Sequence, residues 1–287
     1  MPTLTPAPQM PWPVTRPFRM HPGLKRLPAA PAVDVPPLFM RDALAGAYAD
    51  EKAAVLQAPG PNALHGEPDA EVLQAIAQAY AAQTGVHLHA TADALAGGMQ
   101  EDFVVLHDEP AGMRARFLAV CFPSNWNPAE KLGLDFAAIH APVADNALLQ
   151  AGAAGIVDMA FRKASMLRHV WLITPGADLS QHPESRRSRW EDALLQAEIS
   201  LSGRLIDQVF FRVERQTTLP LPALQRGVFF IRVMVCGLVD VLSVEPSRAA
   251  ELREALHSMS DAVVHYRGMQ GVRERLLQEL QELQALG

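Results

Sequence analysis

The chain has 287 residues, of which 49% are hydrophobic and 20% are charged, and its formal net charge is −6. A nucleic-acid-binding domain would need a surplus of Lys and Arg, so the acidic balance argues against that class of partner. Apolar runs stay shorter than the roughly 18 residues of a membrane-spanning helix. Length and composition therefore predict a soluble globular protein with one elaborated domain or two closely packed ones.

The N-terminus and the cysteines both indicate a cytoplasmic location. Residues 1–17 contain six prolines and no apolar stretch as long as that of a signal peptide, so no secretory leader is expected. Cys121 and Cys236 each lie in an apolar run typical of a strand. This placement favours reduced thiols in the core over a disulfide bond.

The first part of the chain is predicted to be an extended arm followed by helices and a β-hairpin. Proline-rich residues 1–37 favour an extended arm, because proline lacks the amide hydrogen that helices and central strands need. The pattern turns helical over 38–57 and 69–83. Two β-favouring runs, 103–106 and 117–122, then flank a Pro-Ala-Gly turn, which is typical of a hairpin.

The second part is predicted to complete an antiparallel sheet and to end in helices. A helical pattern covers 145–162, and three β-favouring runs follow at 169–174, 209–216 and 228–235. After Pro246 the pattern is helical again up to Gly268, and a last amphipathic helix follows. The predicted class is α/β in the broad sense (α+β), with an antiparallel sheet flanked by helices.

Common short catalytic signatures are missing from the sequence. It contains no Gly-rich phosphate loop, no nucleophile elbow, no paired-cysteine zinc site and no histidine pair one helical turn apart. Dinucleotide-binding and zinc enzymes are therefore disfavoured. Two cysteines are also too few for a four-cysteine iron–sulfur cluster, and no flavin or nicotinamide fingerprint is present. Any redox reaction would need electrons from elsewhere.

One dense segment, residues 121–143, leaves a strand, turns on prolines and ends with His140 among apolar neighbours. A neutral imidazole in a dry slot is what a haem iron takes as a protein ligand. A lone histidine beside apolar residues is also common as a core residue or helix-end group. The residues alone leave both interpretations open.

The predicted strand over residues 210–217 carries charged side chains on both faces. Alternation places Arg212 and Glu214 on one face and Arg215 on the other. Arg232 stands between two aliphatic residues on the next strand and raises the same question. These side chains either line a site or face solvent.

Taken together, these segments resemble the family of haem-dependent oxidative N-demethylase α subunits. The resemblance spans about residues 100–268 and rests on motifs in the same order, namely Cys-Phe-Pro-Ser-Asn-Trp (121–126) with Pro-Ala-Glu-Lys-Leu-Gly (128–133), Ile-His-Ala-Pro-Val (139–143), Val-Glu-Arg-Gln-Thr (213–217) with Leu-Pro (221–222), Phe-Ile-Arg (230–232) and Tyr-Arg-Gly (266–268). Two departures leave the substrate open. The segment after Gln216 lacks an expected basic residue, and residues 168–171 match the family's Arg-x-Asn-Trp only loosely.

The resemblance implies a PAS-like core that encloses haem b. The chain is then expected to consist of the proline-rich arm 1–37, this core over residues 38–268 and the C-terminal amphipathic helix 269–287. It further implies that a small substrate such as an amine is oxidised with dioxygen and with electrons from a reductase partner subunit. No membrane or nucleic-acid partner is expected, and a homo-oligomer is left open.

The same resemblance implies roles for six residues: His140 as the axial ligand and metal-binding residue, Trp126, Arg212 and Arg232 as further cofactor-binding residues, and Glu214 and Arg215 as catalytic residues. His21, in an Arg-Met-His-Pro-Gly segment, is a second candidate axial ligand. The main alternative is a haem-binding or gas-sensing PAS-like module without turnover. A third interpretation is a cofactor-free scaffold in a larger enzyme, with His140 packed in the core.

Overall fold

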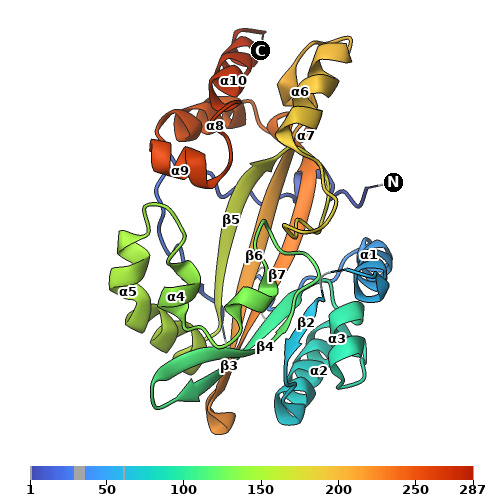
Figure 1. Ribbon diagram of the computed structural model, residues 1–287, viewed down its shortest axis with the longest axis vertical. Coiled ribbons are helices and arrows are strands. Elements are labelled where there is room, and N and C mark those ends of the chain that lie inside the picture. Colours follow the sequence, from blue (N-terminus) through green and yellow to red (C-terminus); the bar gives the residue numbers. More distant parts are fainter. Residues whose placement is uncertain (1, 29–35, 61, 287) are drawn as a thin grey trace.

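A computed structural model describes residues 2–28, 36–60 and 62–286 of the chain. Its centre is a seven-stranded sheet in which every pair of neighbours is antiparallel, in the order β1-β5-β6-β7-β3-β4-β2 (Figure 1). The strands are β1 (Lys25–Arg26), β2 (Leu64–Gly66), β3 (Asp102–Glu109), β4 (Gly112–Ala119), β5 (Met166–Thr174), β6 (Phe210–Leu221) and β7 (Arg226–Gly237).

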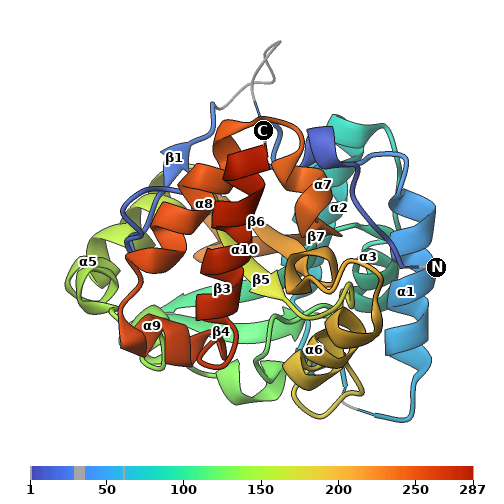
Figure 2. The ribbon, with the colours of Figure 1, turned by 90° about the horizontal axis from the view of Figure 1, so that it is seen from above.

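Helices lie on both sides of this sheet, which confirms the predicted α+β class. In Figure 1, α4 and α5 lie to the left of the long strands and α1, α2 and α3 to the right, while Figure 2 shows α8 and α10 side by side. The α-helices are α1 (Ala45–Gln57), α2 (Ala70–Thr84), α3 (Ala92–Gly98), α4 (Phe136–His140), α5 (Ala147–Asp158), α6 (Trp190–Ile199), α7 (Leu238–Leu242), α8 (Ser247–His257), α9 (Asp261–Tyr266) and α10 (Arg273–Leu286), and α5 continues as a π-helical turn, Met159–Lys163.

The cross-strand register assigns alternate residues of β5, β6 and β7 to two faces of the sheet. The face that packs against α4, α5 and the π-helical turn is called the α5 face, and it carries Arg168, Val170, Leu172, Arg212, Glu214, Gln216, Ile231 and Val233. The other is called the α8 face, and it carries His169, Trp171, Val213, Arg215, Arg232 and Met234.

Each face has its own hydrophobic core. On the α8 face, Trp171, Val213 and Met234 pack with buried residues of α6, α7, α8 and α10. The apolar stripe of α10 belongs to this core, because Leu276 and Leu280 are completely buried in it. The stripe on the last helix therefore packs against the protein's own core and is not free to dock a second subunit.

The N-terminal arm is extended, as predicted, apart from a short 3-10 turn at Ala7–Gln9 and strand β1. It packs firmly against the sheet. The Thr5 amide donates to the carbonyl of Val235 at 2.7 Å, and the ring of Trp12 lies 5.1 Å from that of Phe211. The predicted arm also includes residues 29–35, which lie outside the described residues.

The helix predicted over residues 38–57 begins later than expected, at Ala45. The segment before it is non-helical because its backbone carbonyls accept hydrogen bonds from side chains of the sheet. Arg215 donates to the carbonyl of Leu38 at 3.1 Å, and Arg232 donates to that of Met40. A helix over these residues would turn the same carbonyls toward its own amides.

Both cysteines are free and buried, which confirms that they are core thiols and not a disulfide. Burial raises the pKa of Cys121 to about 12 and that of Cys236 to about 11. Both thiols are therefore protonated at neutral pH. Among the described helices, none combines the length and the apolar character needed to cross a lipid bilayer.

Candidate functional site

A group of polar side chains lies on the α5 face, surrounded by aliphatic residues. The register places Arg168 of β5 directly opposite Gln216 of β6, and Glu214 opposite Val170 and Val233. The Gln216 side-chain amide donates to Glu214 Oε2 at 2.8 Å. This hydrogen bond fixes one carboxylate oxygen of Glu214 and leaves the other able to accept.

The α5 face of β5 is covered less completely than its α8 face. Trp171 and Ile173, which point to the α8 face, are each only 4% exposed. Val170 and Leu172, which point to the α5 face, remain half-buried. Solvent therefore reaches apolar side chains next to the polar group, as expected of a surface that receives a largely apolar ligand.

His140 is held at the end of the short helix α4. The carboxylate of Asp135 caps the start of that helix by accepting from the Ala138 amide at 2.9 Å. The imidazole ring packs on the ring of Phe136 at 4.1 Å, and its Nδ1 lies 2.8 Å from the Phe136 carbonyl oxygen. Because a carbonyl can only accept, Nδ1 carries the hydrogen and Nε2 keeps its lone pair.

Burial lowers the pKa of His140 below its usual value, and the positive charges of Arg168 and Lys131 lower it further. The hydrogen bond to Phe136 opposes these effects only in part. At neutral pH the imidazole is therefore uncharged, which is the form that binds a metal ion. Ile139, next to His140, packs against the same apolar cluster as Met166 of β5, so α4 lies beside the end of β5 that precedes Arg168.

These residues fit a haem better than a site built from protein ligands alone. Within the described part of the chain, no three His, Cys, Asp or Glu side chains are grouped so that they could hold a metal ion. A haem iron takes its equatorial ligands from the porphyrin and needs only an axial ligand from the protein. His140 offers a free Nε2, and its neighbour Ile139 packs, as Trp126 does, against the apolar cluster on the α5 face.

Arg212 also lies on the α5 face, but most of its donors are already in use. Its guanidinium donates to Ser124 Oγ at 2.9 Å and to the carbonyls of Phe122, Asp178 and Leu179 at 3.2, 3.0 and 2.9 Å. Burial lowers the pKa of Arg212 to about 10, so the group stays charged at neutral pH. Arg212 therefore ties two loops to the sheet with four of its five N–H groups.

Arg215 and Arg232 lie on the α8 face, directly opposite each other. Arg215 donates to the carbonyls of Pro37 and Leu38, and Arg232 forms an ion pair with Asp42 at 2.5 Å. The structure therefore does not bring them together with Glu214 and His140. The physical reason is the strand alternation, which turns Arg215 away from its neighbour Glu214, and Arg232 follows Arg215 because the two are paired in register.

The remaining predicted residues differ in their surroundings. Trp126 is half-buried and contacts both apolar clusters on the α5 face. His21, the alternative ligand, is exposed on the N-terminal arm. Three of the six predicted site residues, His140, Trp126 and Glu214, thus share the α5 face with side chains free to meet a ligand.

The match to known protein families covers this whole region. Residues 66–277 match the family described as haem-dependent oxidative N-demethylase, alpha subunit-like. The chain belongs to this family. The match extends over strands β3 to β7 and includes His140 and Glu214, which confirms the resemblance inferred from the motifs.

Within the part of the chain that matches the N-demethylase family, two further residues belong to the candidate site. Arg168 lies opposite Gln216. Tyr266 of α9 lies near Glu214: burial raises the pKa of the tyrosine, and the negative charge of Glu214 raises it further. Tyr266 stands in a motif used for the resemblance, at 266–268, whereas Arg168 stands in the segment 168–171, which matches the family's pattern only loosely. The sequence signal for Arg168 is that it alternates with Val170 and Leu172 on one strand face.

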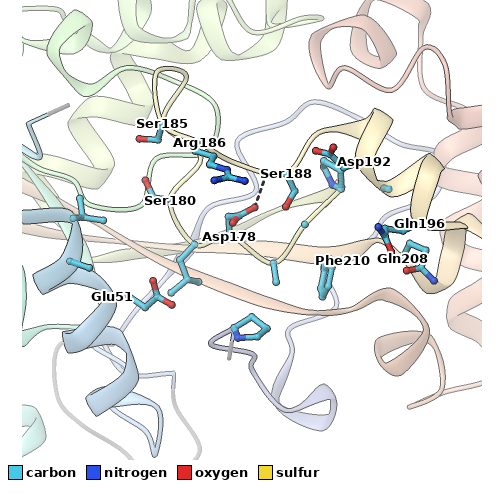
Figure 3. Close-up of a pocket in the computed structure, with 18 of the residues that line it drawn as sticks. Glu51, Asp178, Ser180, Ser185, Arg186, Ser188, Asp192, Gln196, Gln208 and Phe210 are labelled. Carbon is cyan, nitrogen blue, oxygen red and sulfur yellow. Dashed lines mark hydrogen bonds between the residues drawn. The ribbon is translucent and has the colours of Figure 1, made fainter. Parts of the chain in front are cut away.

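A separate cavity of about 680 Å³ lies between α1, α6 and the loop over residues 175–188 (Figure 3). None of the six residues predicted from the N-demethylase motifs lines it. Asp178 forms part of the wall, accepts from the Ser188 amide at 3.0 Å, and offers its backbone carbonyl to Arg212. The loop that Arg212 holds therefore separates this cavity from the polar group on the α5 face.

Proposed function

We propose that this chain is the haem-binding subunit of an oxidative N-demethylase, and that haem b would be held on the α5 face by Nε2 of His140. The observation that carries the proposal is the state of His140: neutral, with Nδ1 bonded to a backbone carbonyl and Nε2 free. Membership in the haem-dependent family supports it. When bound, the haem supplies the iron that activates dioxygen.

The residues around His140 have distinct tasks in this proposal. Trp126 and Ile139 exclude water from one side of the cofactor, because both belong to the apolar cluster beside α4. Phe136 keeps the imidazole in the ligating tautomer through its carbonyl. Val170 and Val233, on either side of Glu214, keep the substrate region of the sheet apolar.

Glu214 is proposed to bind the substrate nitrogen. A small secondary amine is protonated at neutral pH, and a carboxylate on an apolar face attracts an ammonium strongly. Gln216 already occupies Oε2, so Oε1 is the oxygen that accepts the substrate N–H. The same oxygen can hold the proton that the ammonium must lose before its N-methyl group is oxidised.

The reaction needs electrons that this chain does not provide. Oxidative demethylation consumes dioxygen, two electrons and two protons, and it converts an N-methyl amine into the demethylated amine, formaldehyde and water. The two cysteines are buried protonated thiols, too few for a four-cysteine iron–sulfur cluster. The description of the family as an alpha subunit supports a reductase partner subunit as the electron donor.

Formaldehyde release from a secondary methylamine tests this function. The full chain, loaded with hemin and supplied with electrons by a ferredoxin and its reductase, is expected to form formaldehyde. Glu214→Gln is expected to keep the haem spectrum but to lose about a hundredfold in kcat/KM, because the neutral amide neither pairs with the ammonium nor takes its proton.

Glu109→Gln is the matched control, since Glu109 pairs with Arg116 at the surface. It is expected to leave turnover unchanged. A loaded protein that binds carbon monoxide and dioxygen reversibly but releases no formaldehyde would instead be a gas-binding module. Full activity of Glu214→Gln would remove Glu214 from the reaction.

A further inference from the structure

Arg168 has a buried hydrogen-bond donor without a partner. Its Nε is shielded from solvent, and no acceptor for it exists among the residues that the structure describes. A buried polar group left in this state costs about 1–3 kcal/mol. A ligand that supplies an acceptor would remove this cost. The free donor of Arg168 therefore indicates a position where a bound ligand accepts a hydrogen bond.

The other arginines on the central strands have their terminal guanidinium nitrogens bonded to the chain, although Nε of Arg232 is also without a partner. Arg212 donates to four oxygens, and Arg215 donates to two backbone carbonyls. Arg232 has Met40 and Asp42. Each of these three guanidinium groups holds a loop or the N-terminal segment in place, whereas Arg168 holds nothing of the kind among the described residues.

The charge of Glu214 does not satisfy Arg168. The two residues are diagonal neighbours on the α5 face, and Glu214 counteracts the lowering of the Arg168 pKa that burial causes. Nevertheless, within the described ranges no guanidinium–carboxylate contact within 4.0 Å joins them, and Glu214 is bonded to Gln216. A second anion can therefore approach Arg168 without displacing an internal ion pair.

The free donor of Arg168 also lies near the imidazole that is free to bind iron. Ile139, the neighbour of His140, packs against the same apolar cluster as Met166, which lies two residues before Arg168 on the same face of β5. A haem bound through His140 carries two carboxylates on one edge of its ring, and guanidinium groups bind carboxylates with paired hydrogen bonds. We propose that Arg168 binds a propionate carboxylate of the haem; this inference rests on the proposed function.

Two porphyrins test the assignment: hemin, and hemin dimethyl ester, whose carboxylates are blocked. The wild-type chain is expected to bind hemin about ten- to a hundredfold more tightly than the ester, the usual strength of a hydrogen bond to a charged group. Arg168→Met is expected to bind hemin only as tightly as the ester and to leave the affinity for the ester unchanged. Arg26→Met, which removes an exposed arginine from the neighbouring strand β1, is expected to behave like the wild type.

Two results would overturn the assignment. One is an Arg168→Met variant that keeps the preference for hemin; the other is a variant that loses the same factor of affinity for both porphyrins. If the wild type binds neither porphyrin, the proposed function fails as well, so the two failures are distinguishable. Should the Met variant lose its native circular dichroism, Arg168→Lys replaces it, and it is expected to retain part of the preference because it retains the charge.

Discussion

Replacing Arg212 by Met is expected to lower the free energy of unfolding by about 3–5 kcal/mol, because each buried acceptor that loses its donor costs about 1–3 kcal/mol. The guanidinium is completely buried and donates to oxygens of Phe122, Ser124, Asp178 and Leu179. Met fills a similar volume but leaves those acceptors unpaired. Urea denaturation of the protein without cofactor measures the change.

The same variant separates a structural role for Arg212 from the cofactor-binding role implied by the family resemblance. If Arg212 only ties the two loops to the sheet, the stability loss appears without haem. A variant as stable as the wild type but deficient in haem binding would show instead that Arg212 holds the cofactor. Arg26→Met, at an exposed position, is the control and is expected to unfold like the wild type.

Asp102→Asn is expected to destabilise the protein by about 3–5 kcal/mol, because it leaves a buried ammonium without its counter-ion. Lys52 of α1 is completely buried, and its Nζ lies 2.8 Å from Asp102 Oδ1. Asn keeps an oxygen to accept from the Phe122 amide, which Asp102 bonds at 2.7 Å. The loss therefore reports the missing charge and not a missing backbone hydrogen bond.

Removing both charges is expected to recover most of this stability. In Lys52→Met with Asp102→Asn, neither charge of this pair remains in the core, so the double variant is expected to be more stable than Asp102→Asn alone. Urea denaturation of the three proteins tests the pair. A double variant less stable than Asp102→Asn would mean that Lys52 stabilises α1 through contacts other than this ion pair, such as its 2.7 Å hydrogen bond to the Glu101 carbonyl.

Local sequence patterns are sufficient to predict most of the sheet and several helices. The helix over 69–83 is predictable because Asp69 caps its start and Gly85, with a left-handed backbone, ends it at Thr84. The alternation along β6 predicts that Glu214 and Arg215 lie on opposite faces, and the pairing with β7 confirms it. Patterns of this kind act within one element, so a single sequence contains them.

Contacts between distant segments are not predictable in the same way. The late start of α1 depends on Arg215 and Arg232, which lie far along the chain and bind the carbonyls of residues 37–40. Strand β2 has only three residues and exists because it pairs with β4. Neither the carbonyl partners nor the pairing leaves a periodic signal in the sequence.

The candidate site, too, could be predicted from the sequence only in part. His140 stands out because its neighbours are apolar and its motif matches a family, whereas Arg168 does not, because its importance lies in an unpartnered donor that only the packed structure reveals. Conversely, Arg212 and Arg232 resemble site residues in the sequence because buried arginines on strands are rare. Their partners are internal acceptors.

The absorbance spectrum of the hemin-loaded chain, compared with that of His140→Ala, tests the central assignment most directly. The wild type is expected to give a sharp Soret band of a histidine-ligated haem, and His140→Ala to lose it while keeping native circular dichroism. Added imidazole is expected to restore the band in the variant, because it supplies the missing nitrogen ligand. An unaltered Soret band in His140→Ala would show that the iron is bound elsewhere.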